Sequence, residues 1–220
     1  MNPRARRIAL RFIVTLAALG LWFWTQSLLG ARPAQVDGIS DSLHQSTATL
    51  NAYFRAHPHS ADLLLIVSSA LIDALGLFLL LRWLFGTSVR PFLGLLVLML
   101  LRQSTQALCA LPPPAGMIWH DPGVPSLLVT YSVASDFFFS GHTAIAVFAA
   151  TELARLKKIW LTFLGVLIAM FEIVAVIVLR AHYTMDVFTG LLAALCVAAF
   201  VQRLSSPIDR ALSTNARPKG

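Results

Sequence analysis

Residues 159–179 read IWLTFLGVLIAMFEIVAVIVL, a run of 21 residues whose only charge is Glu172. A helix needs about 20 predominantly apolar residues to cross the hydrocarbon core of a bilayer, so this run predicts a transmembrane helix. Comparable runs lie near 12–30, 62–85, 91–111, 138–154 and 184–202. We therefore expect an all-α bundle of six transmembrane helices.

The composition supports a membrane protein. Of the 220 residues, 57% are hydrophobic and only 12% are charged, and the mean hydropathy is +0.75. A soluble domain of this length has too small an interior to hide so many apolar runs from water. The net charge of +7 does not indicate nucleic acid, because the basic residues flank apolar segments and form no groove. Cys109 and Cys196 lack metal-ligand spacing, so we expect no zinc site.

The basic residues predict the orientation of the bundle, since cytoplasmic flanks hold the excess of lysine and arginine. The residues 1–7 precede an apolar run too long for a signal peptide, which we interpret as a retained first helix. Only Arg32, Arg55 and Arg180 fall on the side that we expect to face outward. The cytoplasmic side would hold Arg4, Arg6, Arg7, Arg11, Arg82, Arg90, Arg155, Lys157, Lys158, Arg203, Arg210, Arg217 and Lys219.

This distribution predicts that both termini are cytoplasmic and that the loops after the first, third and fifth helices face outward. We expect one integral membrane domain over residues 1–220, with its functional motifs within 101–201 and a cytoplasmic tail at 203–220. The short loops favour a bacterial inner membrane, with the outward side facing the periplasm.

Two of the outward connections have recognisable character. In the polar stretch 31–60, the apolar residues Leu43, Leu50, Tyr53 and Phe54 predict a short interfacial helix. The connection 112–135 is rich in proline and glycine, which predicts an irregular loop instead of another span.

Several charged residues lie within the predicted spans. Such charges are costly in a bilayer and usually face a cavity or a partner, so Arg102 and Asp186 are candidate functional residues. For Asp73 and Glu172, internal pairing that fixes helix packing is an equally good explanation.

The first motif with chemical meaning is residues 136–143, DFFFSGHT, at the outward end of the predicted fourth helix. A helix N-terminus presents unpaired N–H groups, so Ser140 and Gly141 are candidates to bind a phosphate. His142 lies one turn away and can exchange a proton with an oxygen bonded to phosphorus. Asp136 would attract a cationic headgroup or cap the helix, and the residue pattern favours neither role.

The second motif is residues 180–186, RAHYTMD, between the fifth and sixth helices. His182 and Asp186 are four residues apart and share one helical face, so the carboxylate can accept a hydrogen bond from one imidazole nitrogen. The other nitrogen is then a nucleophile. A single histidine near a membrane interface is more often a polar anchor, but two histidines, an aspartate and Arg102 at one depth indicate a phosphoester site.

The sequence Phe139-Ser140-Gly141-His142, followed by His182-Tyr183-Thr184-Met185-Asp186, resembles the lipid phosphatase and phosphotransferase superfamily. Its form is similar to the sphingomyelin synthase branch. Arg180 and the stretch from Arg102 to Leu111-Pro112-Pro113-Pro114 are also similar to phosphatidylcholine:diacylglycerol cholinephosphotransferases. The resemblance covers roughly 101–201.

The resemblance implies a two-step transfer of a phosphocholine or phosphoethanolamine headgroup from a glycerophospholipid to a lipid alcohol such as diacylglycerol or ceramide. His182 would be the nucleophile, His142 the acid and then the base, and Asp186 the orienting carboxylate. The non-bridging phosphate oxygens would be bound by Arg102, Ser140, Gly141 and Arg180. No metal or other cofactor is implied.

Two departures from the superfamily disfavour a plain phosphatase. Similar phosphatases place an arginine six residues before the nucleophilic histidine, where this chain has Val176, and their Arg-Pro pair corresponds only to Arg90-Pro91, predicted on the cytoplasmic side. A phosphatase or hydrolase that uses water as the acceptor is nevertheless the second hypothesis. A lipid transporter or scaffold, in which the histidines only bind headgroups, is the third.

Overall fold

The computed structural model describes residues 13, 39–109, 111–129, 131 and 137–215. The chain divides into two units, Met1–Ser40 and Asp41–Gly220. Asp136 and nearly all of the first predicted span lie outside the described residues.

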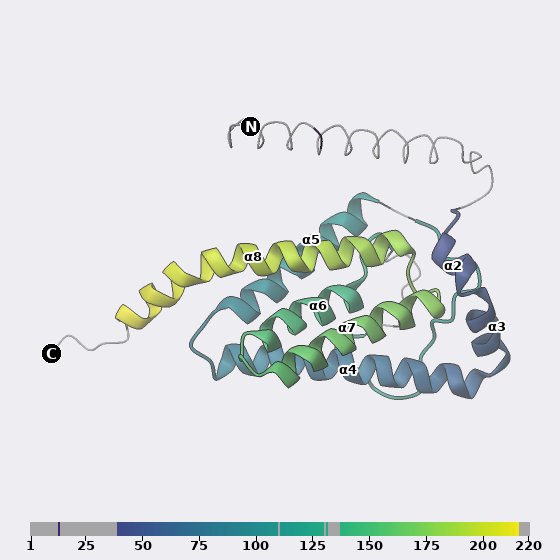
Figure 1. The fold of residues 1–220 in the computed structure, drawn as a ribbon, viewed down its shortest axis with the longest axis horizontal. Helices are drawn as coiled ribbons and strands as arrows, with labels where there is room; N and C mark the ends of the chain where they lie inside the picture. The colour runs from purple at the N-terminus through teal and green to yellow at the C-terminus, as the bar shows by residue number, and fades with distance from the viewer. Residues whose placement is uncertain (1–12, 14–38, 110, 130, 132–136, 216–220) are drawn as a thin grey trace. The chain divides into compact units, whose positions relative to one another are not determined.

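The second unit has helices and no strands over the described residues, which confirms the predicted all-α class (Figure 1). Two short helices, α2 (Ser42–Ser46) and α3 (Ala48–Ala56), precede the bundle. The bundle consists of α4 (Pro58–Leu84), α5 (Arg90–Leu108), α6 (Gly141–Ala154), α7 (Ile159–Val178) and α8 (Thr184–Asn215).

Four of these helices, α4, α5, α7 and α8, are long and apolar enough to cross a membrane. They match four of the predicted spans. The fifth match, α6, has 14 residues and begins only at Gly141, after Ser140 caps its N-terminus. At 1.5 Å per residue it is about 21 Å long, short of the roughly 30 Å of a hydrocarbon core. Of the six predicted spans, four correspond to long apolar helices in the described residues and one corresponds to the shorter α6.

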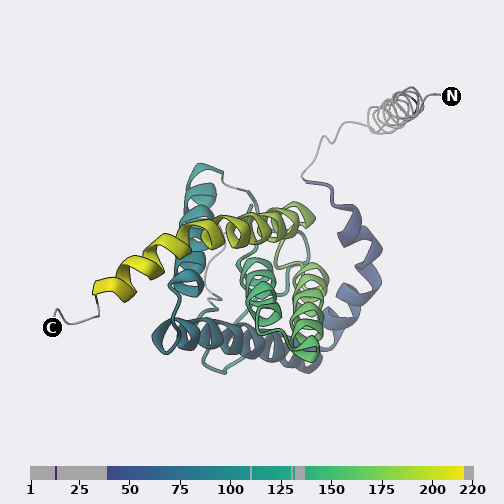
Figure 2. The same ribbon diagram turned by 60° about the vertical axis from the view of Figure 1, so that its left-hand side comes forward.

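α6 lies at the centre of the bundle. It packs against α4, α5, α7 and α8, which enclose it in Figure 2. Its side chains are buried on every face, Phe148 completely so. Gly94 of α5 and Gly165 of α7 permit this close packing, because a side-chain carbon at either position would collide with Phe148 or Ala150.

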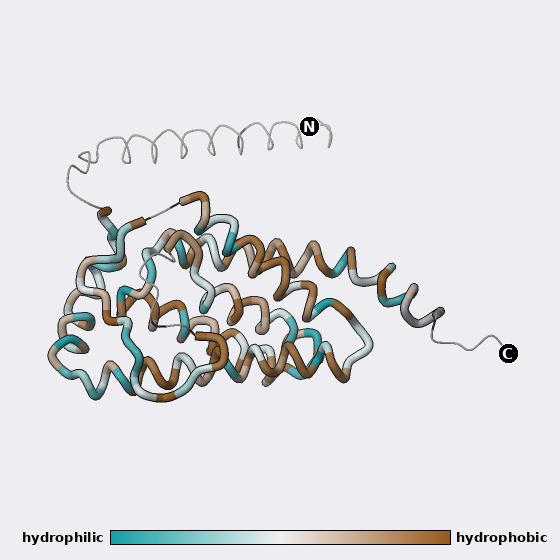
Figure 3. Tube along the Cα trace, turned by 180° about the vertical axis from the view of Figure 1, so that it is seen from behind, coloured by the Kyte–Doolittle hydropathy of each residue, from teal (hydrophilic) through white to brown (hydrophobic). Residues whose placement is uncertain are grey.

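The outer surface of the four long helices is apolar and uncovered by protein. Between 17% and 39% of the residues in their apolar windows are buried within the protein. Large hydrophobic side chains such as Leu63, Leu100, Phe163 and Phe200 are more than half exposed. Figure 3 shows that hydrophobic residues predominate along these helices. A water-soluble surface does not have this character, so the protein is an integral membrane protein.

The basic turns meet at one end of the bundle. Arg90 at the start of α5 donates two hydrogen bonds of 2.7 Å to Glu152 near the end of α6. Arg155 lies 3.7 Å from the same carboxylate and contacts Gln202 of α8. α8 continues as a helix to Asn215, so residues 203–215, predicted as a tail, extend the last helix.

α2 and α3 confirm the helix predicted within 31–60, and the structure shows which side of it is buried. Leu43, Leu50 and Tyr53 are about half exposed. The buried side is polar, since His44 is 6% exposed and Asn51 is 3% exposed. These two polar residues face the connection between α7 and α8.

Candidate active site

The turn between α7 and α8 holds His182 in a defined orientation. His182 Nδ1 lies 3.1 Å from Asp186 Oδ2, and the same oxygen accepts a hydrogen bond of 3.1 Å from the amide of Tyr183. A carboxylate only accepts, so Nδ1 carries the hydrogen and Nε2 keeps its lone pair. Asp186 and His182 are both buried. The arrangement leaves Nε2 as the basic, nucleophilic atom.

The start of α6 is bonded directly to this turn. The amide of Ser140 donates to the backbone carbonyl of Asp186 at 3.0 Å, and the Ser140 hydroxyl caps α6 by accepting from the amide of Thr143. Gly190 of α8 makes the approach possible, because a side-chain carbon there would lie 2.6 Å from the Ser140 carbonyl oxygen. The two sequence motifs, some forty residues apart, thus form one continuous unit.

His142, on the first turn of α6, is buried at 8% exposure. Its ring meets Trp119 edge to face, with centroids 5.3 Å apart. Its Nε2 has no hydrogen-bond partner among the described residues. A buried polar atom without a partner is costly, and it is therefore available for a substrate oxygen.

Arg102 reaches the same place from α5. A side-chain carbon added to Gly141 would lie 3.2 Å from Arg102 Nε and 3.5 Å from its Cδ, so the arginine lies directly over the first residue of α6. The guanidinium and the positive end of the helix dipole are then next to each other. Both favour an anion at this point.

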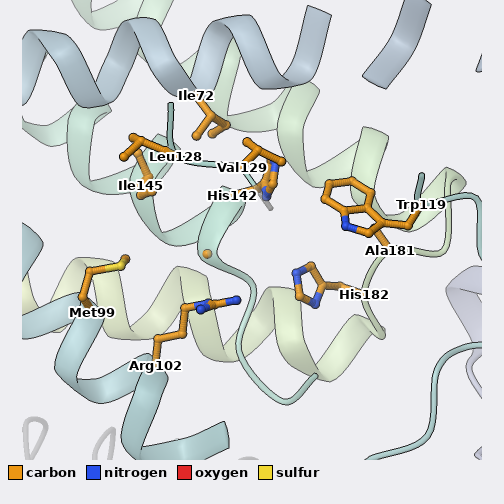
Figure 4. Close-up of a pocket in the computed structure, with 11 residues that line it drawn as sticks. Ile72, Met99, Arg102, Trp119, Leu128, Val129, His142, Ile145, Ala181 and His182 are labelled. Atoms are coloured by element: carbon orange, nitrogen blue, oxygen red, sulfur yellow. The ribbon is translucent and has the colours of Figure 1, made fainter. Parts of the chain in front are cut away.

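These groups surround one cavity of about 80 Å³. Figure 4 shows Arg102, His142 and His182 around it, with Trp119 at one side. A cavity of this size has room for several water molecules or a phosphoryl group. The cavity is lined by Arg102, Trp119, Gly141, His142 and His182, and by the apolar residues Ile72, Met99, Leu128, Val129, Ile145 and Ala181.

Two predicted phosphate-binding residues do not line this cavity. The Ser140 hydroxyl is completely buried as the cap of α6. The Arg180 guanidinium donates to the backbone carbonyls of Ala115 at 2.6 Å and His44 at 3.2 Å. In the structure these residues therefore support the backbone around the cavity. Gly141 and Arg102 are the predicted phosphate-binding residues that line it.

Sequence reasoning missed the contribution of the loop 111–131. Trp119 from this loop packs on His142, and Leu128 and Val129 form part of the cavity wall. An irregular loop has no periodicity that would show which side chains point inward. Trp119 could have been noticed as an aromatic residue in a polar, proline-rich stretch.

Asp73 and Glu172, for which the sequence allowed internal ion pairing, accept hydrogen bonds from neutral groups. Asp73 of α4 accepts from the Ser126 hydroxyl at 2.9 Å and from the amides of Leu127 and Leu128 at 2.8 and 2.9 Å. It thus fastens the loop that lines the cavity. Glu172 is fully buried and accepts from the Ser68 hydroxyl at 2.6 Å. In the described part of the chain, no three acidic, histidine or cysteine residues are grouped to hold a metal.

A family model provides the identification. The model named AtPDCT1/2, phosphatidylcholine:diacylglycerol cholinephosphotransferase-like, matches residues 40–203. The chain belongs to the AtPDCT1/2 family. Both histidine motifs and the buried polar residues of α2 and α3 lie within the matched region. The predicted resemblance to cholinephosphotransferases is confirmed, and the closer resemblance to sphingomyelin synthases stays a prediction.

A solved structure supports the fold of this AtPDCT1/2-family member. The crystal structure of Aquifex aeolicus LpxE matches with a TM-score of 0.56 and 22% identity, over 77% of this chain and 99% of that chain. At this identity the likeness concerns the fold. No curated protein sequence gives a significant match. Together the two matches identify a membrane enzyme of the lipid phosphatase and phosphotransferase superfamily.

Proposed function

We propose that this protein transfers a phosphoalcohol headgroup, phosphocholine or phosphoethanolamine, from a glycerophospholipid to a lipid alcohol such as diacylglycerol or ceramide. The observation that carries the proposal is the orientation of His182. Its Nδ1 is engaged by Asp186 at 3.1 Å, and its ring lines the same cavity as His142 and Arg102. A nucleophile, a proton donor and a cation around one small cavity are the groups that phosphoryl transfer requires.

In the first step, the lone pair of His182 Nε2 attacks the donor phosphorus. The bond between phosphorus and the glycerol oxygen breaks as the new N–P bond forms. His142 gives a proton to the departing oxygen, which leaves as a diacylglycerol hydroxyl. Asp186 stabilises the positive charge that develops on the His182 ring.

In the second step, the oxygen of the acceptor hydroxyl attacks the same phosphorus. Its proton passes to His142, the N–P bond breaks, and His182 returns to its starting state. Arg102 and the first turn of α6 hold the non-bridging oxygens in both steps, because negative charge concentrates there. In this proposal Arg180 and Ser140 act by holding the surrounding backbone.

Hydrolysis, with water in place of the lipid alcohol, is the second candidate because the same groups can activate water. Two observations favour transfer. Arg90 is bonded to Glu152 at the far end of the bundle, and position 176 is a buried valine, so neither supplies a cation to the cavity. Part of the cavity lining is apolar, formed by Ile72, Met99, Leu128, Val129 and Ile145, which suits a lipid acceptor.

The test uses purified protein in vesicles of phosphatidylcholine labelled in its choline headgroup, with diacylglycerol or ceramide added. We expect the label to appear in the acceptor lipid and to disappear with the His182→Ala variant. Transfer that survives His182→Ala would refute the proposal. Release of water-soluble product at a rate independent of the acceptor would establish hydrolysis instead.

A transporter or scaffold would give a third result. The parent protein would then turn over no lipid, and a variant with both His142→Ala and His182→Ala would bind or move lipids as the parent does.

We also propose that the cavity opens on the periplasmic side of a bacterial inner membrane. The basic turns gather at the opposite end of the bundle, as expected of a cytoplasmic face. His120 is exposed near the cavity end of α4, where it bonds Asp62 at 2.7 Å. A cysteine replacing His120 should react with an impermeant maleimide in spheroplasts, and protection there would contradict this orientation.

A further inference from the structure

The first residue of the second unit caps two helices at once. One carboxylate oxygen of Asp41 accepts hydrogen bonds of 3.0 and 3.1 Å from the amides of Leu43 and His44, at the start of α2. The carboxylate also accepts 2.6 Å bonds from the amide and the hydroxyl of Thr184, the first residue of α8. Asp41 therefore ties α2 to the helix that follows His182.

His44 contacts the peptide of the nucleophile itself. Its Nε2 lies 2.9 Å from the backbone carbonyl oxygen of His182. A carbonyl only accepts, so His44 must carry its hydrogen on Nε2. The His44 ring also stacks on Tyr183, with centroids 5.7 Å apart. His44 is 6% exposed, so little water competes for this bond.

Two further contacts hold the residues before His182. Asn51 of α3 donates to the carbonyls of Val178 at 2.9 Å and Gly116 at 3.2 Å. Arg180 has a φ of +54°, a left-handed conformation that is strained for a non-glycine residue. Its guanidinium is bonded to the carbonyls of Ala115 and His44. Such a conformation persists only where surrounding contacts impose it.

We infer that His44 is a positioning residue for His182. Asp186 orients the imidazole through Nδ1, and His44 fixes the peptide to which that imidazole is attached. Both restraints are needed, because a ring can keep its bond to Asp186 while its backbone shifts and carries Nε2 away from the phosphorus. A displacement of about 1 Å can reduce a rate about 100-fold. The inference rests on the proposed role of His182 as nucleophile.

The test compares two substitutions that separate the hydrogen bond from the packing. His44→Phe keeps an aromatic ring to stack on Tyr183 and removes the donor. His44→Gln loses the ring and supplies an amide that can donate to the same carbonyl. The matched control is His57→Phe, because His57 is exposed, bonds the carbonyl of Tyr53 one turn earlier, and stacks on the Tyr53 ring as a phenylalanine also can.

The first measurement is the single-turnover rate of label loss from phosphatidylcholine. We expect His44→Phe to lower this rate about 10- to 100-fold and to leave the apparent affinity for the donor within about two-fold. His44→Gln should recover most of the rate, and His57→Phe should match the parent. A general loss of folded protein would not give this pattern of rescue.

The second measurement does not need turnover. Orthovanadate, which forms adducts with a correctly placed histidine, should bind the parent and His44→Gln, and should bind His44→Phe about ten-fold more weakly. If the parent binds vanadate in this His44-dependent way but transfers no label, the positioning role stands and the proposed function fails. Equal rates and equal vanadate affinities for the parent and His44→Phe would overturn the positioning role, as would a parent that neither turns over nor binds vanadate.

Discussion

Two buried polar sites, the Arg90–Glu152 pair and the histidine site, lie toward opposite ends of the bundle and differ in their hydrogen bonding. At the end with the basic turns, Arg90 and Glu152 meet through two hydrogen bonds of 2.7 Å. At the other end, His142 Nε2 and Asp186 Oδ1 are buried without hydrogen-bond partners among the described residues, and His142 lines a cavity of about 80 Å³.

This difference separates packing from chemistry. The carboxylate of Glu152 is bonded on both oxygens by Arg90, and such a pair stabilises one arrangement of helices. A buried polar atom left unbonded beside a cavity, as His142 Nε2 is, costs free energy that a hydrogen bond to a substrate can recover. We therefore expect substitutions around the cavity to change the rate of headgroup transfer. Substitutions at the Arg90–Glu152 pair should change the free energy of unfolding.

After the loss of transfer expected for His182→Ala, the largest effect at the cavity end is expected for His142→Ala. Removal of a general acid and base lowers the reaction rate about 100- to 10,000-fold. The size of this decrease should depend on the leaving group. A phosphocholine ester of nitrophenol needs little protonation of its leaving oxygen, so the variant should cleave it at close to the parent rate. The measurement is the ratio of variant to parent rate for both donors. Equal losses for both would show that His142 is not the proton donor.

At the basic end, Arg90→Ala should lower the free energy of unfolding by about 3 kcal/mol, because it leaves the buried Glu152 without its main partner. The rate per folded molecule should not change. Unfolding in a denaturing detergent measures the stability. The double variant Arg90→Met, Glu152→Leu removes both charges and should recover most of the loss. A fall in the rate per folded molecule would show that the two ends are coupled.

A smaller effect is expected where α6 touches α8. In Gly190→Ala the new carbon would lie 2.6 Å from the Ser140 carbonyl oxygen, so the start of α6 must shift. The rate should fall about 10- to 100-fold. The matched control is Gly165→Ala, whose new carbon would lie 2.9 Å from Ala150, away from the cavity. That control should lose stability and keep its rate per folded molecule. Equal rate losses in both variants would indicate general distortion.

The smallest effect concerns Asp41 and pH. Burial raises the pKa of its carboxyl, but the hydrogen bonds from Thr184 and His44 outweigh burial, and the pKa lies below its ordinary value. The Asp41 carboxylate therefore stabilises the folded protein at neutral pH, and this stabilisation is lost as the pH falls below about 4. The melting temperature of the parent should fall more steeply with acid than that of Asp41→Asn. Parallel curves would show that Asp41 contributes nothing. The effect is small because the carboxylate is partly exposed.

Much of the fold and of the site could be predicted from local patterns. Apolar runs of about 20 residues predicted α4, α5, α7 and α8, because a bilayer requires that length. The pairing of His182 with Asp186 was predicted, but the expected shared helical face was wrong. His182 lies in the turn before α8, and Asp186 on the first turn of α8 bonds back to it at 3.1 Å. That the segment of α6 is another full span stays a prediction, because α6 has 14 residues and hydropathy does not distinguish a helix covered by lipid from one covered by other helices.

The sequence alone thus predicted a membrane bundle, its family, and the two histidines that line the cavity. These depend on composition and on short motifs. The sequence was not sufficient for the assignment of Arg180 and Ser140 to backbone support, or for the roles of Trp119, Asp73 and His44. Those depend on contacts between segments up to 138 residues apart. Such contacts form only when the helices pack, and no local pattern encodes which carbonyl or ring a distant side chain will meet.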